Sequence, residues 1–266
     1  MTWRYYPLWI MAVWAVLALA GPWLPLAPNH IELSKILAGP EASAWLGYDD
    51  LGRPIWDRLV VGARTSFVVG FWVVTISLIV GTTLGAFSAY VGGTVDLVVV
   101  RVIDIFLAVP GILLAIALAG VMGPGIENVV LALSLVGWVG YARLSRAQVM
   151  SLRHRDHVTA ALSLGTRPGG IIYRHLIPLI SAPLIIEATF GIAGVVIAEA
   201  SLSFLGLGVQ PPAASWGSMI RDGTRYMLVA PHMVVAPGIA IMLVVLAVNL
   251  LGDRLRDILD VRTRIK

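Results

Sequence analysis

Three carboxylic acids, Asp104, Glu187 and Glu199, lie within apolar runs that are long enough to cross a membrane. A charge in hydrocarbon is costly, so such residues usually line an interior path or belong to a buried pair. Arg101 stands three residues before Asp104, and this helical spacing favours a local ion pair. Glu187 and Glu199 lie within roughly 120° of each other around one helix. They either line a translocation route or anchor a neighbouring helix.

Pairs of glycines mark the same apolar runs. Gly81 and Gly85 have the GxxxG spacing that lets two helices approach closely. Similar pairs that share a helix face are Gly137 with Gly140 and Gly191 with Gly194. Tight packing is the simpler interpretation, and gating is the alternative. The possible pore or packing residues are therefore Asp104, Glu187, Glu199, Gly81 and Gly85.

Patterns that would indicate catalysis do not occur in the sequence. Neither lysine, Lys35 or Lys266, follows a glycine-rich loop, so the chain has no P-loop for ATP. The HExxH and GxSxG patterns and the dinucleotide fingerprint do not occur either. His154 and His157 have a spacing that suits a metal, but arginines flank them and no third ligand is near, so a solvated face is simpler. We expect no catalytic residue, metal or cofactor in this chain.

The composition is that of an integral membrane protein. The chain is 58% hydrophobic and 13% charged, with a mean hydropathy of +0.88. A span needs about 20 apolar residues. Six segments qualify, at 8–27, 66–90, 102–122, 128–147, 181–205 and 232–252. The absence of cysteine excludes disulfides and thiol chemistry. A net charge of +4 could indicate nucleic-acid binding, but positive cytoplasmic loops explain it more simply, and we expect no nucleic-acid partner.

The distribution of positive charge predicts the orientation. The first apolar run resembles a secretory signal, with Ala18 and Ala20 at a cleavage site, but it continues through Trp23 and Leu26, which favours a retained helix. If the N-terminus is inside, most arginines fall on the inner side, in 143–174 and 254–264. This bias obeys the positive-inside rule and predicts that both termini are cytoplasmic.

The segment 157–178 then lies on the cytoplasmic side, between two membrane helices. Val158, Ala161, Leu162 and Gly165 have helical spacing and form one apolar stripe. Gly165 can end this helix in the left-handed conformation, and Pro168 prevents its resumption. Glycines at 169 and 170 allow a sharp redirection, and a second helical pattern, 171–177, stops before Pro178.

The predicted stripe needs a surface to cover it. It could rest on lipid headgroups, but helices of that kind usually carry large anchors such as Trp or Phe. This helix presents Ala and Gly, which favours close docking into a groove of another protein.

These residues resemble the EAA loop of bacterial ABC importer permeases. The matching residues are Thr159-Ala160-Ala161, Gly165 and the run Ile171-Ile172-Tyr173-Arg174-His175-Leu176-Ile177-Pro178. Four further stretches resemble the second permease subunit of dipeptide, oligopeptide and nickel importers: "GYDDLGRPIWDRLVVGARTSF" (47–67), "VGWVGYARLSRAQVMSLR" (136–153), "AEASLSFLGLGVQPPAASWGSMI" (198–220) and "LAVNLLGDRLRDILD" (246–260). The resemblance covers about residues 30–260, in the same order.

The resemblance implies an all-α membrane protein with six spans and the type I ABC importer permease fold. It implies an N-terminal helix and outer loop (1–65), a permease core (66–255) with a coupling loop (151–180), and a cytoplasmic tail (256–266). The ATPase-coupling interface would comprise Asp156, Thr159, Ala160, Ala161, Leu162, Gly165, Arg174, His175 and Pro178. Thr159 stands where the motif usually has an acid, and Asp156 stands three residues earlier.

The resemblance also implies the partners and the mechanism. A related second permease would complete the pore, one or two ABC ATPase subunits would bind ATP-Mg, and a solute-binding protein would deliver solute to the outer segments 28–65 and 206–231. The chain would be a multi-pass subunit of the bacterial cytoplasmic membrane and not itself an enzyme. Dipeptides or short peptides are the expected solutes, with nickel or haem as alternatives. An ion-coupled carrier that uses the intramembrane acids and a non-transporting scaffold are the alternatives from other classes.

Overall fold

The computed structural model describes residues 5–42 and 44–259, which form an elongated bundle of helices. Part of the predicted cytoplasmic tail, 260–266, lies outside the described residues. The long helices are α1 (Tyr6–Ala20), α2 (Ile55–Val91), α3 (Gly93–Leu107), α4 (Gly111–Met122), α5 (Ile126–Leu152), α8 (Ile177–Phe204) and α10 (His232–Leu259). The shorter ones are η2 (Gly21–Trp23), η3 (Leu33–Lys35), α6 (Asp156–Ser163), α7 (Pro168–Gly170), η4 (Ile171–Leu176) and α9 (Trp216–Thr224).

Five of the six expected spans are confirmed, and the sixth takes another form. Among the described residues, five segments are long and apolar enough to cross a membrane: 6–23, 55–91, 126–152, 168–204 and 232–259. The predicted span 102–122 is instead a bent pair, because α3 and α4 meet at 85°. Pro110 causes this break, since a proline disfavours helical backbone in the residue before it. Pro110 then adopts an extended conformation and precedes the first residue of α4.

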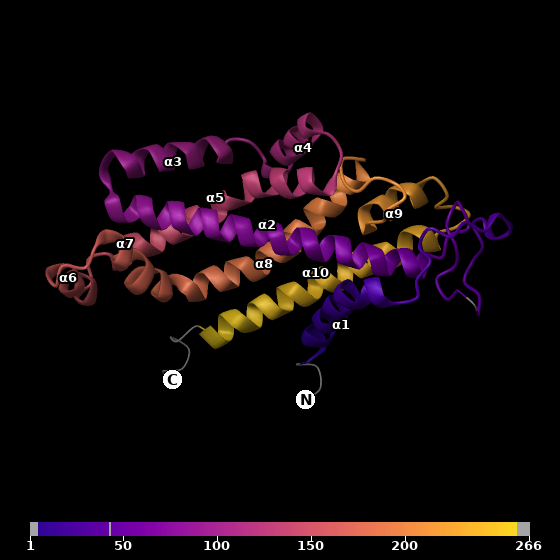
Figure 1. Ribbon diagram of the computed structural model, residues 1–266, viewed down its shortest axis with the longest axis horizontal. Coiled ribbons are helices and arrows are strands. Elements are labelled where there is room, and N and C mark those ends of the chain that lie inside the picture. The colour runs from indigo at the N-terminus through magenta and orange to yellow at the C-terminus, as the bar shows by residue number, and fades with distance from the viewer. Residues whose placement is uncertain (1–4, 43, 260–266) are drawn as a thin grey trace.

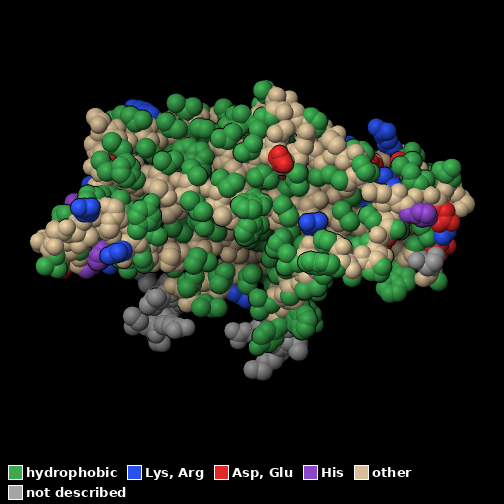
Figure 2. Space-filling view, viewed as in Figure 1, with side chains coloured by type: hydrophobic (Ala, Val, Ile, Leu, Met, Phe, Trp, Pro, Cys, Tyr) green, Lys and Arg blue, Asp and Glu red, His purple; other side chains and the backbone are tan. Residues whose placement is uncertain are grey.

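The bundle has two distinct ends (Figure 1). One end carries α6 and α7, and residues 156–178 are called the knob. The opposite end, called the loop end, carries α9 and the long connection between α1 and α2. Charged side chains and histidines gather at the two ends, and the surface between them is mainly hydrophobic or neutral (Figure 2). This arrangement suits a chain whose middle lies in lipid.

The helix pair α2–α5 is the most extensive contact in the bundle. Gly81 and Gly85 make it possible, because a Cβ at Gly81 would collide with the Trp138 carbonyl oxygen and one at Gly85 with that of Ala142. This close approach favours the packing interpretation of the glycine pair over gating. Ser145, on α5, fits into the same contact, and its hydroxyl lies 3.3 Å from the Thr82 carbonyl oxygen.

Two indole N–H groups fasten the loop end to α2. Trp14 of α1 donates to the Ala63 carbonyl at 3.2 Å, and Trp216 of α9 donates to the Leu59 carbonyl at 3.0 Å. Both rings are buried. Ser215 caps α9 through a reciprocal pair of hydrogen bonds with Ser218. α9 is therefore fixed against the ends of the long helices.

A buried carboxylate organises the connection between α1 and α2. Asp49 accepts the Arg53 side chain at 2.7 Å and the backbone N–H groups of Leu51 and Arg53, each at 2.9 Å. The guanidinium of Arg58 approaches the same carboxylate at 3.4 Å. Because Arg58 lies in α2, this cluster attaches the connection to the first turn of that helix.

The predicted ion pair between Arg101 and Asp104 is wrong. Within the described residues no ion pair joins them, and both side chains are exposed. Arg146 of α5 instead binds Asp96 of α3 through two hydrogen bonds of 2.6 and 2.7 Å. A bidentate guanidinium–carboxylate pair is stronger than a single charged contact. It links α3 to α5 directly.

Candidate functional site

The knob begins with the short helix α6 and a glycine turn. The Gly165 backbone has φ +82°, and the Thr166 N–H returns to the Ala161 carbonyl at 3.1 Å. Only glycine adopts this left-handed conformation without cost, so the predicted end of the helix at Gly165 is confirmed. Pro168 then occupies the first turn of the next helix, where its missing N–H is harmless.

The second half of the knob differs from the expectation. Gly169 and Gly170 are helical, and the chain continues through η4, a π-helix, directly into α8. The predicted stop before Pro178 is therefore wrong. Helical structure runs from Pro168 to Phe204, and Pro178 follows shortly after the π-helical turns of η4. The knob is thus the end of a long membrane helix, folded back on α6.

One face of α6 is buried against the rest of the protein. Val158 and Ala161 are buried, and Val158 belongs to a hydrophobic cluster with Ile171, Ile172 and Leu176 of η4. The same cluster reaches α2 and α5 through Ala86, Ala89, Val149 and Leu152. Arg153 reinforces it, because its side chain donates to the Ala89 carbonyl at 2.7 Å. The knob therefore packs as one unit with three membrane helices.

The other face of the knob is exposed. Leu162 and Leu164 are 55% and 86% exposed, and Ala160 is also accessible. The remaining residues predicted for the coupling interface are exposed or half-buried: Asp156, Thr159, Gly165, Arg174, His175 and Pro178. The sequence stripe thus divides into an inner part, Val158 and Ala161, and an outer part. Leu164, outside the helical stripe, was missed by the sequence analysis.

Glu199 lies in a polar cage within the bundle. Its side chain is 1% exposed, and its two carboxylate oxygens accept the hydroxyls of Ser66 of α2 at 3.0 Å and Ser203 at 2.7 Å. A buried polar group with such partners does not bear the cost of an unsatisfied one. These contacts favour the anchoring role of Glu199 over the pore-lining one. The two serines have no distinguishing sequence pattern, so they were missed.

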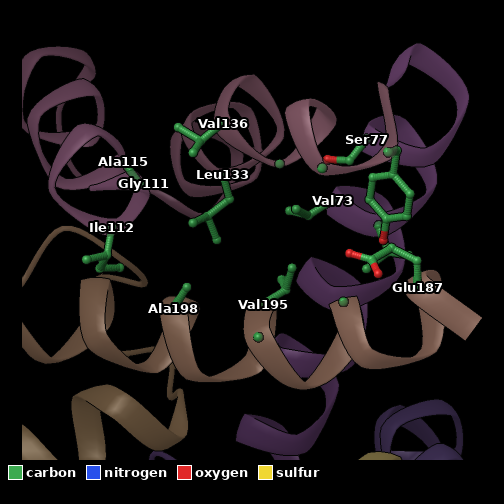
Figure 3. A pocket seen from close by; sticks show the side chains of 16 residues that line it. Val73, Ser77, Gly111, Ile112, Ala115, Leu133, Val136, Glu187, Val195 and Ala198 are labelled. Atoms are coloured by element: carbon green, nitrogen blue, oxygen red, sulfur yellow. The ribbon is translucent and has the colours of Figure 1, made fainter. Parts of the chain in front are cut away.

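Glu187 is placed differently. It lines a cavity of about 270 Å³ between α2, α4, α5 and α8. Figure 3 shows Glu187 and Ser77 at one end of this cavity, and Gly111, Ile112 and Ala115 at the other. All four of the other glycines singled out in the sequence, Gly137, Gly140, Gly191 and Gly194, also line it, so glycines in these helices leave space as well as allow close contacts. Asp104, Glu199, Gly81 and Gly85 are not among its lining residues.

Comparisons with known proteins agree with these features. The profile of the family described as "Binding-protein-dependent transport system inner membrane component" matches residues 81–265. The dipeptide transport system permease protein DppC of Alkalihalophilus pseudofirmus is 45% identical over 227 residues, 85% of this chain and 75% of that protein. The glutathione transport system permease protein GsiD of Pectobacterium atrosepticum is 40% identical over 234 residues, 88% of this chain and 78% of that protein.

A solved structure shares the fold. A chain of the MetNI methionine ABC transporter, in inward-facing conformations, superposes with a TM-score of 0.56 at 20% identity and covers 76% of this chain and 93% of that chain. The resemblance drawn from the sequence motifs is thereby confirmed at the level of family and fold. The chain belongs to the family of binding-protein-dependent transport system inner membrane components.

Proposed function

We propose that this chain imports dipeptides and short peptides as half of the transmembrane pore of an ATP-driven ABC importer. A second, related permease completes the pore, and ABC ATPase subunits hydrolyse ATP on the side of the knob. A solute-binding protein delivers peptide to the loop end. The names of two relatives, a dipeptide permease and a glutathione permease, support this solute class. Both termini are cytoplasmic in this arrangement, as the charge bias indicates.

One observation carries the proposal: the knob is exposed on its outer face and rigidly joined to the bundle on its inner face. On its outer face, Leu162 and Leu164 form an apolar surface whose exposure to water is unfavourable. Its inner face shares a hydrophobic cluster with α2, α5 and α8. A partner protein that binds the outer face and moves therefore displaces the membrane helices as well, because the knob is packed against them.

The connection from the knob to the opposite end is direct. Helical structure is continuous from Pro168 to Phe204, and this segment carries both Glu187 and Glu199. When two ATPase subunits close on ATP, they displace the knob, and α8 tilts with it. Coupling requires that the knob makes different contacts in the two ATPase arrangements, because only differential binding can shift the equilibrium between pore states.

The test is reconstitution of the assembled transporter in vesicles. We expect uptake of radiolabelled dialanine only when ATP is present on the knob side and loaded binding protein on the other. Uptake should persist when ionophores abolish the proton and sodium gradients. Uptake that needs a gradient and not ATP would identify an ion-coupled carrier and overturn the proposal. ATP-driven uptake of nickel or haem without any peptide uptake would overturn the solute class alone.

A further inference from the structure

The cavity that contains Glu187 lies near the middle of the membrane helices. Val73 is the central residue of the 55–91 span, and Val73, Val74 and Ser77 all line the cavity. Glu187 stands next to the centre of the 168–204 span. Substrate sites of transporters commonly lie at this depth, where passage between the two sides is controlled.

Glu187 has no counter-ion among residues 5–42 and 44–259. In the part of the chain that the structure describes, no Lys, Arg or His side chain forms an ion pair with it. Its carboxylate faces the cavity (Figure 3), and a Cβ on Gly140 of α5 would stand 3.7 Å from its Oε1. A carboxylate within the membrane costs free energy, so the residues that carry one there usually have a function. It is therefore available to a cation that enters the cavity.

The rest of the cavity has two contrasting ends. Near Glu187, the Ser77 hydroxyl is buried and has no hydrogen-bond partner, and the Tyr141 ring lies over Gly191 with its hydroxyl 2.5 Å from a Cβ built there. The other end is apolar and contains Ile112, Leu133 and Ala198. A ligand that fits has a cationic group at one end, hydrogen-bonding capacity beside it, and an apolar side chain beyond.

We propose that this cavity is a transient binding site for the N-terminal end of the passing peptide, with Glu187 as the counter-ion of its ammonium group. The proposal rests on the function proposed above. Ser77 and Tyr141 offer hydrogen bonds to the first peptide group, and the apolar end receives the first side chain. The small residues Gly137, Gly140 and Gly191 keep the space open. A site of this kind recognises the ammonium group and the first peptide group, which peptides share, and not the amino-acid sequence of the peptide.

The first test uses the complete absence of cysteine from this chain. Gly194 lines the cavity and a Cβ there meets no atom within 4 Å, so Gly194→Cys places one thiol in the site. In the assembled transporter, the thiol is treated with a cationic trimethylammonium-ethyl and with an anionic sulfonato-ethyl methanethiosulfonate. The mass of this chain reports each rate. Ala198→Cys supplies a second reporter if Gly194→Cys does not assemble.

We expect the cationic reagent to react faster, and Glu187→Gln to lower the ratio of cationic to anionic rates about tenfold, because a nearby full charge is lost. Glu127→Gln, at the start of α5 and outside the cavity, is the matched control and should leave the ratio within about twofold. Dialanine, loaded through the binding protein, should slow the labelling. A ratio that Glu187→Gln does not change would overturn the inference.

The second test separates the site from the transport machinery. In reconstituted vesicles, Glu187→Gln should reduce dialanine uptake about tenfold, while ATP hydrolysis stimulated by loaded binding protein stays within about twofold of the wild type. Uptake equal to that of Glu127→Gln would contradict the inference and leave the proposed function standing. A wild-type transporter that imports no peptide would contradict the proposed function, and the labelling ratio would still decide whether Glu187 makes the cavity select cations.

Discussion

Ser66 of α2 donates a 3.0 Å hydrogen bond to the carboxylate of Glu199 of α8, across 133 positions of sequence and in a site without solvent contact. Ser203, one turn further along α8, donates to the other carboxylate oxygen at 2.7 Å. One acid thereby satisfies two buried hydroxyls and joins two membrane helices. The same two helices also carry the cavity and the knob contacts.

Replacement of Glu199 should therefore affect stability. In Glu199→Leu the two buried hydroxyls lose their acceptor, which costs about 1–3 kcal/mol for each unsatisfied group. We expect a loss of about 2–4 kcal/mol in the free energy of unfolding, measured by denaturation of the purified permease complex in detergent. Glu199→Gln keeps one acceptor oxygen and should lose less than half of that amount. Equal stability of the leucine variant and the wild type would contradict the anchoring role.

The Asp96–Arg146 pair predicts a measurable coupling between α3 and α5. Both side chains are largely shielded from solvent, and their two hydrogen bonds are short. A double-mutant cycle of Asp96→Ala and Arg146→Ala should give an interaction energy of about 1 kcal/mol, after allowance for partial solvent screening. The matched cycle of Arg101→Ala and Asp104→Ala should give an interaction energy near zero. Similar values for the two cycles would contradict the assigned pairing.

The glycine contact between α2 and α5 should tolerate no added methyl group. Gly85→Ala drives a Cβ into the Ala142 carbonyl, and overpacking of this kind costs about 1–3 kcal/mol. The control is Gly238→Ala of α10, where a Cβ meets no atom within 4 Å, and its effect should stay within about 0.5 kcal/mol. Thermal unfolding of the two variants side by side checks the difference, and a neutral Gly85→Ala would disprove the close contact.

The knob predicts different outcomes for two neighbouring alanines. Ala160 is exposed, so Ala160→Glu should leave the fold intact and reduce ATP-driven uptake more than tenfold by placing a charge in the partner contact. The measurement is uptake and ATP hydrolysis in reconstituted vesicles. Ala160→Ser keeps the small size and is the control, with uptake near that of the wild type.

Ala161 is only 7% exposed. Ala161→Glu buries an unpaired acid among apolar side chains, so its main effect should be on folding and assembly, seen as lower yield of the complex. If Ala160→Glu transported normally at normal expression, the idea that the knob transmits force to the helices would fail.

The stability of the loop end should depend on pH through the ionisation of Asp50. Burial, and then the adjacent Asp49 carboxylate, raise the pKa of Asp50 above its ordinary value. The folded state therefore holds this proton more tightly than the unfolded state does. The tighter binding of this proton stabilises the folded state. That stabilisation is fully present below the pKa of Asp50 in the unfolded state, about 3.9, and is lost as pH rises through its pKa in the folded state.

Asp50→Asn removes this titration. We expect the variant to be more stable than the wild type at neutral pH, and its stability to lack the decline that the wild type shows above about pH 4. Melting temperatures of both proteins from pH 4 to 8 check the expectation. Parallel curves would contradict the raised pKa. Asp57→Asn is a suitable control, since its carboxylate lies in the same region and accepts the Ala27 N–H in an exposed 2.9 Å hydrogen bond.

Much of the fold follows from local signals in the sequence. The length and hydropathy of each apolar run predict the spans, and the left-handed preference of glycine predicts the end of α6 at Gly165. The GxxxG pair predicts a close helix contact, although not that its partner is α5. These features depend on residues that are near one another in the chain.

The parts that sequence reasoning missed depend on contacts between distant residues. Asp96 meets Arg146 fifty positions later, and no local spacing distinguishes that pairing from the nearer Arg101–Asp104 pair. Glu187 and Glu199 have the same surroundings in sequence, but a neighbouring serine on α2 makes one an anchor and a cavity leaves the other open. The α3–α4 bend had a local signal in Pro110, but the apolar run around it gave the stronger indication of one straight span.

The bend between α3 and α4 has a consequence for how the cell makes this subunit. Each half is too short to traverse the hydrocarbon alone, and the two helices meet at 85°. Backbone that turns in this way within the hydrocarbon needs protein around it, because lipid cannot replace helical hydrogen bonds. A neighbouring subunit must shield that stretch. We therefore expect solitary copies to be recognised and degraded by membrane proteases, so that synthesis of the two halves of the pore has to be matched in amount and in time.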